Sequence, residues 1–311
     1  MNNLLNIFNK NTHTPPIWLM RQPGRYMTEY MEIKKKFPDF FSMCKNIDAV
    51  YDITFQPIKK FDLDAAIIFS DILIILECLN INVKFVQGIG PVVQKFDIEK
   101  LEIFKEEQFD FNKIRNVYES ISKLKKDLKN LKKPLIGFSA APWTLATYLI
   151  EGQLTKEHVK IREIAYKSPD KLDKIIKLLS KLIIKHLENQ IKYGVDIVQI
   201  FDTHANNMDN HLFDKYFLKE IKNIVAHLKI KFPHIPICLF SKSSRLLDNE
   251  LYNYIDCISF NSHIRMKDYL EKIPNKVFFQ GNLDPMRLVV GGKSMVKVIE
   301  TILKDMENKN F

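Results

Sequence analysis

Short, mainly apolar runs that end in polar residues recur along the chain, with helical segments between them. Seven such runs can be read from the sequence. They occupy residues 17–20, 65–69, 135–140, 196–203, 236–241, 256–261 and 276–282. Such runs are typical of strands buried on both faces, and their alternation with helices predicts a parallel sheet. For 311 residues, seven units favour an α/β fold of the (β/α)8 TIM-barrel type over an open Rossmann sheet. No GxGxxG motif follows the first run.

The segments between the runs have the spacing of amphipathic helices. Apolar residues recur every three or four positions in the segments 48–61, 97–133 and 170–193, which predicts outer helices of the barrel. Residues 141–152 predict a shorter helix, with Pro142 in its first turn. Residues 81–94 read as extended, and their two glycines, Gly88 and Gly90, are weak evidence for a phosphate-binding loop.

Composition places the chain among globular proteins. Charged residues make up 27% and hydrophobic residues 46%, and no apolar run approaches the roughly 18 residues that span a membrane. We expect one barrel domain over residues 1–311, with residues 1–15 as a polar N-terminal extension that lacks a secretory core. The four cysteines, Cys44, Cys78, Cys238 and Cys257, are scattered and form no CxxC pair. This pattern predicts a reducing compartment, with cytoplasm as the default, and disfavours a zinc knuckle or a disulfide framework.

The net charge of +10 raises the question of a nucleic-acid partner. Lysines are mixed with acidic residues along the predicted helices, and no sustained block of arginine and lysine occurs. A nucleic-acid interface normally needs such a block or a basic motif. The positive field also suits a polyanionic small molecule, so charge alone does not choose between partners.

Polar residues at two of the predicted strand ends are candidates for a site. Ser70 and Asp71 follow the run 65–69, and ligands of α/β proteins gather where strands end. The alternative is that one of them caps the next helix. Arg21 and Arg25 flank a Pro-Gly turn signal after the run 17–20. Guanidinium groups bind carboxylates through two hydrogen bonds, so the turn either aims both arginines at one ligand or is an ordinary surface loop.

Three segments, residues 18–26, 65–73 and 137–152, resemble the uroporphyrinogen decarboxylase family of haem biosynthesis. Phe201-Asp202 and residues 280–285 fit its pattern too, and the likeness runs from about Pro16 to the end. The resemblance implies a homodimeric (β/α)8 barrel without metal or organic cofactor. It also implies the reaction, in which the four acetate arms of the tetrapyrrole uroporphyrinogen lose carbon dioxide and leave the methyl groups of coproporphyrinogen.

The resemblance also implies roles for individual residues. Asp71 matches the carboxylate that accepts the pyrrole N–H bonds and stabilises a cationic ring. Arg21 and Arg25 match residues that bind substrate carboxylates. An arginine has also been proposed as the proton donor, and this role stays open for Arg21 because guanidinium groups keep their proton in proteins. Tyr148 matches a tyrosine near the reacting acetate, although a tyrosine at this helical position is more often part of the core.

Three further residues are expected to bind substrate by the same resemblance. Phe201 belongs to the Phe-Asp motif, and Thr203 retains a hydroxyl where the family usually has serine. A third family arginine falls on Lys34 or a neighbour, which keeps the charge and loses the guanidinium fork.

The sequence also departs from the family pattern. Pro23 replaces the usual alanine between the two arginines, and His204-Ala205-Asn206 replaces Trp-Ala-Gly. Asn261-Ser262 stands where the family has Asp-Trp. The family's last strand and its Gly-His-Gly loop would lie beyond Phe311, so we expect a barrel truncated before the eighth unit, without the family's active-site histidine. His204 follows another strand and is not expected to replace it.

Rival interpretations are few. A zinc-dependent methyltransferase on a related barrel would need a His/Cys cluster at the strand ends, whereas Cys238 and Cys257 lie inside predicted strands and no His-x-Cys occurs. An inactive relative that at most binds porphyrinogen is the alternative from another class, since a catalytic site requires a preorganised shell.

Overall fold

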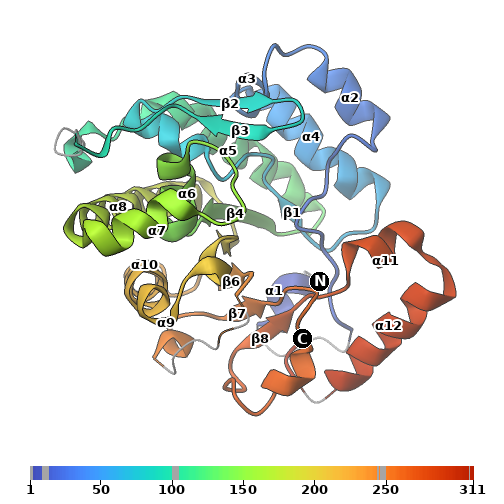
Figure 1. Cartoon of the computed structure of the whole chain (residues 1–311). Helices are drawn as coiled ribbons and strands as arrows, with labels where there is room; N and C mark the ends of the chain where they lie inside the picture. Colours follow the sequence, from blue (N-terminus) through green and yellow to red (C-terminus); the bar gives the residue numbers. More distant parts are fainter. Residues whose placement is uncertain (1–2, 9–13, 100–104, 244, 246–249, 308) are drawn as a thin grey trace.

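The computed structural model describes residues 3–8, 14–99, 105–243, 245, 250–307 and 309–311. At its centre lies a parallel sheet of six strands in the order β1-β4-β5-β6-β7-β8 (Figure 1). The strands are β1 (Ala66–Ile67), β4 (Leu135–Ala140), β5 (Ile197–Asp202), β6 (Ile237–Ser241), β7 (Cys257–Ser259) and β8 (Phe278–Gln280). The order follows the chain apart from a small hairpin, so helices connect the strands and all carboxyl ends lie on one side.

Helices surround this sheet (Figure 1). In the first half they are α1 (Asn3–Ile7), α2 (Thr28–Lys34), α3 (Phe40–Cys44), α4 (Ile47–Lys60), α5 (Arg115–Asn130) and α6 (Pro142–Glu151). In the second half they are α7 (Val159–Lys167), α8 (Pro169–Tyr193), α9 (Asn210–Leu212), α10 (Lys219–Lys231), α11 (Pro285–Val290) and α12 (Gly292–Asp305). The predicted helices at 48–61, 141–152 and 170–193 are confirmed as α4, α6 and α8.

The antiparallel hairpin of β2 (Val83–Val86) and β3 (Gly90–Val93) confirms the extended prediction for residues 81–94. Gly88 and Gly90 have φ of 82° and 97°, in the left-handed region that glycine adopts without strain. These glycines therefore form the turn of a hairpin.

The prediction of a strand at residues 17–20 is wrong. Asp64 donates its amide to the carbonyl of Ile17 at 2.8 Å, but the amide of Ile17 donates to the carboxylate of Asp64 at 2.7 Å instead of a strand backbone. The segment therefore starts beside β1 without forming a ladder. On its other side, the indole nitrogen of Trp18 lies 3.0 Å from the side-chain oxygen of Gln280 in β8. Residues 17–20 thus lie between the two outer strands of the sheet.

The prediction of one helix over residues 97–133 is also wrong in its first half. After β3, Ile98 and Glu99 have 3-10 conformation, and the short 3-10 helices Glu106–Gln108 and Phe111–Ile114 precede α5. Residues 100–104 lie outside the described part of the chain. Asp110 accepts a hydrogen bond from the amide of Asn112 and donates its own amide to Cys78, which anchors the chain away from a helical path.

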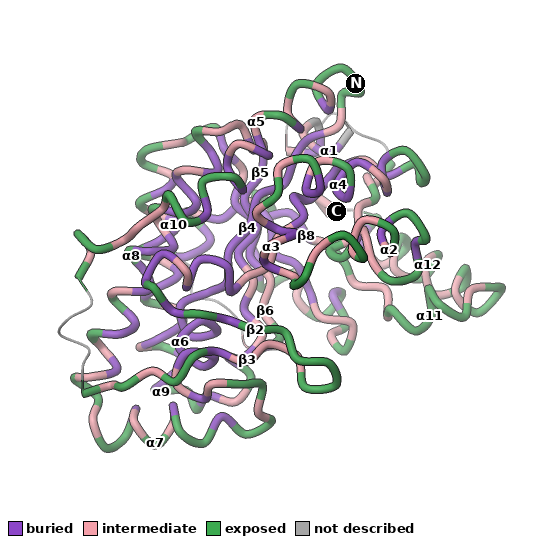
Figure 2. The backbone as a smooth tube through the Cα atoms, turned by 90° about the horizontal axis from the view of Figure 1, so that it is seen from above, coloured by how far each residue is buried: buried purple, intermediate pink, exposed green. Residues whose placement is uncertain are grey.

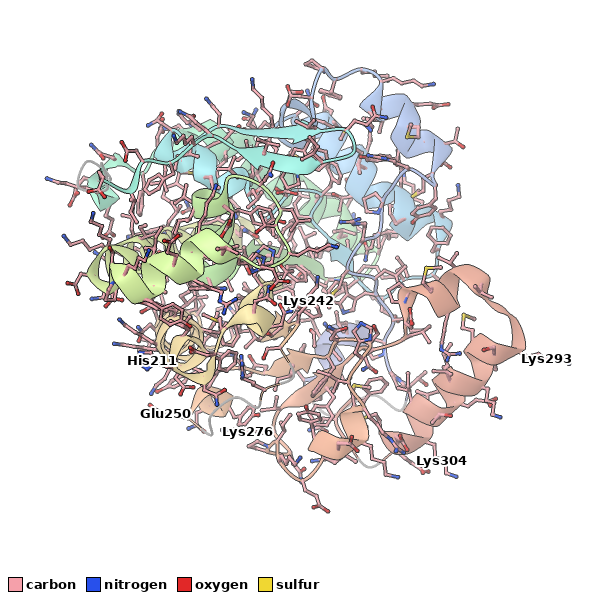
Figure 3. All side chains as sticks on the ribbon, viewed as in Figure 1. His211, Lys242, Glu250, Lys276, Lys293 and Lys304 are labelled. Carbon is pink, nitrogen blue, oxygen red and sulfur yellow. The ribbon has the colours of Figure 1, made fainter. Side chains whose placement is uncertain are left out.

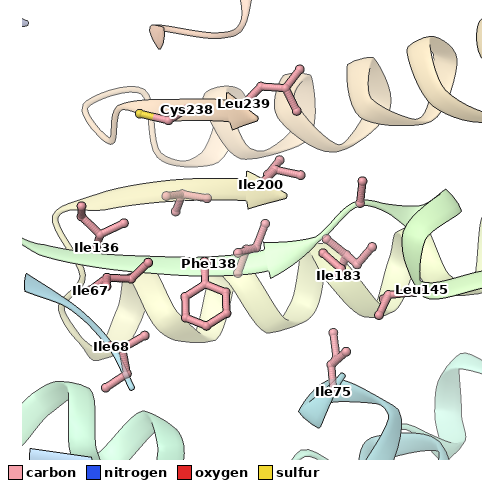
Figure 4. Packing of buried hydrophobic residues seen from close by; sticks show 14 of the residues in the cluster. Ile67, Ile68, Ile75, Ile136, Phe138, Leu145, Ile183, Ile200, Cys238 and Leu239 are labelled. Carbon is pink, nitrogen blue, oxygen red and sulfur yellow. The ribbon is translucent and has the colours of Figure 1, made fainter. Parts of the chain in front are cut away.

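The core lies between the sheet and its helices. All six residues of β4 are buried, as the colouring in Figure 2 shows for the centre of the molecule. Apolar side chains from neighbouring strands and from α8 pack around β4 (Figure 4). Gln190 of α8 accepts from the amide of Phe138 and donates to its carbonyl, each at 2.8 Å. A Cβ on Gly137 would lie 2.3 Å from the Gln190 oxygen, so glycine is required for this close approach of helix and strand.

The C-terminal helices contrast with this core. None of the described side chains of α11 and α12 is buried, and Figure 2 shows both helices at the periphery. Asn310 accepts a hydrogen bond of 2.8 Å from the amide of Phe279 in β8. The parallel α/β barrel class is confirmed, while the missing eighth unit stays a prediction. None of the described helices combines the length and apolar character that crossing a bilayer requires.

Candidate active site

The candidate site lies on what we call the strand-end face, formed by the residues that follow the carboxyl ends of β1, β4, β5 and β6. Backbone hydrogen bonds continue past the strands and hold these segments together. The amide of Ala141 donates to Phe201 at 2.8 Å, and the amide of Lys242 donates to Asp202 at 3.1 Å. Asp71, α6, Thr203 and Lys242 are therefore placed at one edge of the sheet.

Asp71 is only partly exposed and uses one oxygen for a local turn. Its Oδ1 accepts from the amide of Leu73 at 2.8 Å and so closes a local turn, whereas the 3-10 helix that follows, Ile74–Leu79, has Leu73 as its N-cap and no side-chain cap. No donor among the described residues reaches Oδ2. Burial raises the pKa of Asp71 to about 6, although the Leu73 hydrogen bond and the charge of Arg21 both act to lower it. The carboxyl therefore has one oxygen left for a ligand and changes charge near neutral pH.

The loop that carries the two predicted arginines is fixed to β1 by Gln22. This buried side chain donates to the carbonyl of Ala65 at 2.7 Å and accepts from the amide of Ile67 at 3.4 Å. Arg21 and Arg25 on either side of it are exposed, and no described carboxylate forms an ion pair with either. The structure thus favours an anchored loop with free guanidinium groups over an ordinary surface loop.

Arg21 and Arg25 also act electrostatically on the same neighbours. Arg21 lowers the pKa of Asp71, as described above. Burial raises the pKa of Tyr30 in α2, and the charges of Arg25 and Arg21 both oppose that rise. The charges of both arginines therefore act on Tyr30, and that of Arg21 acts on Asp71 as well.

Tyr148 is buried on α6, in agreement with the core alternative, but it also adjoins the site. Burial raises the pKa of its phenol, and the charge of Asp71 raises it further. Its ring centroid lies 5.0 Å from that of His204. The charge of Asp71 thus acts on Tyr148 and that of Arg21 acts on Asp71, while the catalytic roles of these three residues stay predictions.

Phe201, Thr203 and Lys34, which were predicted to bind substrate, have no described contact with Asp71. Phe201 is partly buried at the end of β5, with its ring 5.7 Å from that of Phe138. Thr203 follows it, and its amide donates to the hydroxyl of Thr144 at 3.0 Å. Lys34 ends α2 one turn beyond Tyr30. No described contact joins any of these side chains to Asp71, so their roles stay predictions.

Asp202 forms a second buried carboxyl on this face, which the sequence analysis noted only as part of a motif. Four groups donate to it: the hydroxyls of Thr144 (3.0 Å) and Ser241 (2.7 Å) and the amides of His204 (3.4 Å) and Ala205 (3.2 Å). Burial raises its pKa against these hydrogen bonds, which lower it. Its oxygens are occupied by the protein, so it fixes the ends of β5 and β6 instead of facing a ligand.

His204 was not expected in the site, yet it packs against Tyr148. Only 5% of His204 is exposed, and its ring centroid lies 4.4 Å from that of His158. Its Nδ1 is buried without a hydrogen-bond partner in the described structure. Burial lowers the pKa of His204 to about 3, and the nearby His158 and Lys242 lower it further. No local pattern indicates this contact, because His158 arrives from the loop before α7.

We next considered whether the described side chains of this face could bind a metal ion. Among the described residues, no group of three histidine, cysteine, aspartate or glutamate side chains has the arrangement of a metal site. Cys238 and Cys257 are register partners in β6 and β7, and both are buried in the sheet.

A family model and the sequences of known proteins that match the chain carry the same description. The family model "Uroporphyrinogen decarboxylase (URO-D)" matches residues 2–311. The chain is 39% identical over 300 residues to the uroporphyrinogen decarboxylase of Rickettsia bellii, covering 96% of this chain and 87% of the relative. It is 37% identical over 315 residues to that of Campylobacter jejuni, covering 97% and 88%.

A solved structure shares the fold at low sequence identity. The structure of a methyltransferase from Methanosarcina mazei superposes with a TM-score of 0.77 at 15% identity, covering 99% of this chain and 89% of that one. This likeness supports the barrel architecture alone.

Proposed function

The chain belongs to the uroporphyrinogen decarboxylase family, and from this premise we propose how its residues perform the reaction. The chain is a carboxy-lyase that decarboxylates uroporphyrinogen in porphyrin biosynthesis. The observation that supports a residue-level account is that Asp71 follows β1, to which Gln22 also anchors the loop of Arg21, and that the charges of Arg21 and Asp71 act on Asp71 and Tyr148 respectively. The alternative of an inactive porphyrinogen-binding relative is not favoured by the family match.

Asp71 stabilises the charge that develops on the substrate. Loss of carbon dioxide from an acetate on a pyrrole leaves a carbanion, which the ring absorbs if it has first been protonated. The ionised carboxylate accepts the pyrrole N–H groups through Oδ2 and offsets the positive charge of the protonated ring. Because Asp71 is largely enclosed by protein, this attraction is stronger than it would be in water.

The basic residues orient the substrate. Arg21 and Arg25 bind carboxylates of the tetrapyrrole from the loop that Gln22 anchors to β1. Lys34 adds a further positive charge on α2. Because guanidinium groups retain their proton in proteins, an electrostatic role suits Arg21 better than proton transfer. Tyr148 lies beside the reacting acetate, and Phe201 and Thr203 contact the substrate from the end of β5.

The assembly and location follow from the family resemblance. We propose a cytoplasmic homodimer of a single barrel domain, acting without metal or organic cofactor and without nucleic acid or membrane. Analytical ultracentrifugation tests the dimer, and a monomer across the micromolar range would contradict it.

Anaerobic turnover of uroporphyrinogen tests the function. Products are oxidised and separated by their number of carboxylates, and Asp71→Asn is compared with Asp62→Asn as a matched control on an exposed carboxylate. Coproporphyrinogen from the wild type and from Asp62→Asn, but not from Asp71→Asn, is the expected result. A folded wild type that forms no product with fewer carboxylates would overturn the proposal.

A further inference from the structure

The positions of the strands place Lys242 across the strand-end face from the two arginines. Residues 17–20, which lead into Arg21, lie between β1 and β8. Lys242 follows β6, with β7 and β8 separating it from residues 17–20 on one side. On the other side, β5, β4 and β1 separate them. Figure 3 shows Lys242 near the middle of the molecule, at the end of the β6 ribbon.

Lys242 is exposed and has no ion-pair partner among the described residues. The nearest strand-end carboxyl along the ladder is Asp202, whose carbonyl accepts the Lys242 amide at 3.1 Å. The side chain of Asp202 is already occupied by hydroxyls and amides, as described above. A positive charge is therefore held at the sheet edge with no described acid to neutralise it.

The charge of Lys242 reaches the part of the site that surrounds Tyr148. It acts on the ring of His204, which in turn packs on Tyr148 at 5.0 Å between centroids. His204 is enclosed and its Nδ1 has no described partner, so it is a poor place for a second cation. His158, 4.4 Å from His204, is also buried. Lys242 thus supplies positive charge on this side, whereas the guanidinium of Arg245, which also follows β6, donates to the carbonyls of Ala205 and Met208.

We propose that Lys242 binds a carboxylate of the tetrapyrrole on the side of the strand-end face opposite Arg21 and Arg25. This inference rests on the proposed function, which supplies a substrate with carboxylates around its whole periphery. A ring centred on Asp71 and held only by the arginine loop would be restrained along one edge. A second basic contact across the face restrains the opposite edge, and it lies near the tyrosine proposed to adjoin the reacting acetate.

The test uses Lys242→Met, which keeps most of the stem and removes the charge, and Lys242→Arg, which keeps the charge. Lys293→Met is the matched control, since Lys293 is an exposed lysine on α12 at the edge of the molecule (Figure 3). Two quantities are measured: KM and kcat in anaerobic turnover, and the Kd of uroporphyrinogen by rapid anaerobic ultrafiltration in the cold. The second measurement does not require turnover.

Loss of one charge-assisted hydrogen bond at an accessible site predicts a KM and a Kd about tenfold higher for Lys242→Met. The KM and Kd of Lys242→Arg are expected to stay within about threefold of the wild-type values, and those of Lys293→Met are expected to equal them. Equal Kd values for wild type and a folded Lys242→Met would overturn the inference even if turnover is normal. Weaker binding by Lys242→Met without turnover in any variant would support the inference and contradict the proposed function.

Discussion

The indole nitrogen of Trp18 lies 3.0 Å from the side-chain oxygen of Gln280, although 262 residues separate the two along the chain. Gln280 also donates to the hydroxyl of Ser259 in β7. These side chains join residues 17–20 to the last strands of the sheet, where no backbone ladder does so.

This hydrogen bond contributes to stability, and it can be measured by a double-mutant cycle. Trp18→Phe and Gln280→Leu each remove one partner, and the coupling free energy of the pair is expected to be about 1 kcal/mol in urea unfolding. Trp18→Phe is also expected to raise KM, because Arg21 follows on the same segment. A coupling energy near zero would show that the contact does not hold the segment in place.

Asp71→Asn is expected to stabilise the fold at alkaline pH while abolishing turnover. Because burial raises the pKa of Asp71 from 3.8 to about 6, the folded protein retains a proton between these values that the unfolded chain has released. The stability contributed by this group is full below about pH 4 and is lost as the pH rises through 6. The variant should gain about 3 kcal/mol over the wild type at pH 8 and little at pH 4. Urea unfolding at pH 8 and at pH 4 measures this difference in free energy of unfolding, with Asp62→Asn as the control at an exposed carboxylate.

Arg21 and Arg25 are expected to affect the pH profile differently. Turnover needs ionised Asp71, so kcat/KM of the wild type should fall as the pH drops through about 6. Arg21→Met removes a charge that lowers this pKa, and its acid limb should move to higher pH, whereas Arg21→Lys should keep it in place. Arg25→Met should raise KM without moving the limb. An acid limb that stays fixed in Arg21→Met would contradict the closeness of Arg21 and Asp71.

His204 is expected to make the fold sensitive to acid. Burial lowers its pKa from 6.5 to about 3, so the unfolded chain binds a proton in this range that the folded protein does not. The stability it contributes is full above pH 6.5 and is lost as the pH falls toward 3. At pH 5 this amounts to about 2 kcal/mol, which His204→Phe should recover when unfolding is compared between pH 7 and pH 5. His211→Phe, at an exposed histidine, is the matched control. If both variants lost the same free energy of unfolding between pH 7 and pH 5, His204 would not be the source of the acid sensitivity.

Periodicity and strand-end chemistry were sufficient to predict much of the fold. The apolar run of β4 and the helical spacing of α8 are strong local signals, and the structure confirms both. Residues 17–20 have the same apolar character but no ladder, because their partners are the carboxylate of Asp64 and the side chain of Gln280. Which hydrogen bond a backbone amide makes depends on the assembled barrel, and no local pattern contains that information.

The candidate site, like the fold, was predictable from the sequence only in part. The location of Asp71 could be predicted because it follows a buried apolar run, and the end of a strand is where a barrel places its ligands, while its role in the reaction stays a proposal. The packing of His204 between Tyr148 and His158 could not, because it depends on how the loop after β5 meets α6 and the start of α7. Lys242 shows no motif of its own, and its unneutralised charge is visible only once Asp202 is seen to be occupied.

The carboxyl of Asp202 is held at once by the first turn of α6, the last residue of β6 and the loop after β5. Each of these segments would lose a hydrogen bond to a buried carboxyl if it moved away, which is costly for each of them. The loops around the strand-end face are therefore linked into one cooperative unit. They would exchange their amide hydrogens together, and substrate entry would depend on a single opening of this unit, not on independent motions of its loops.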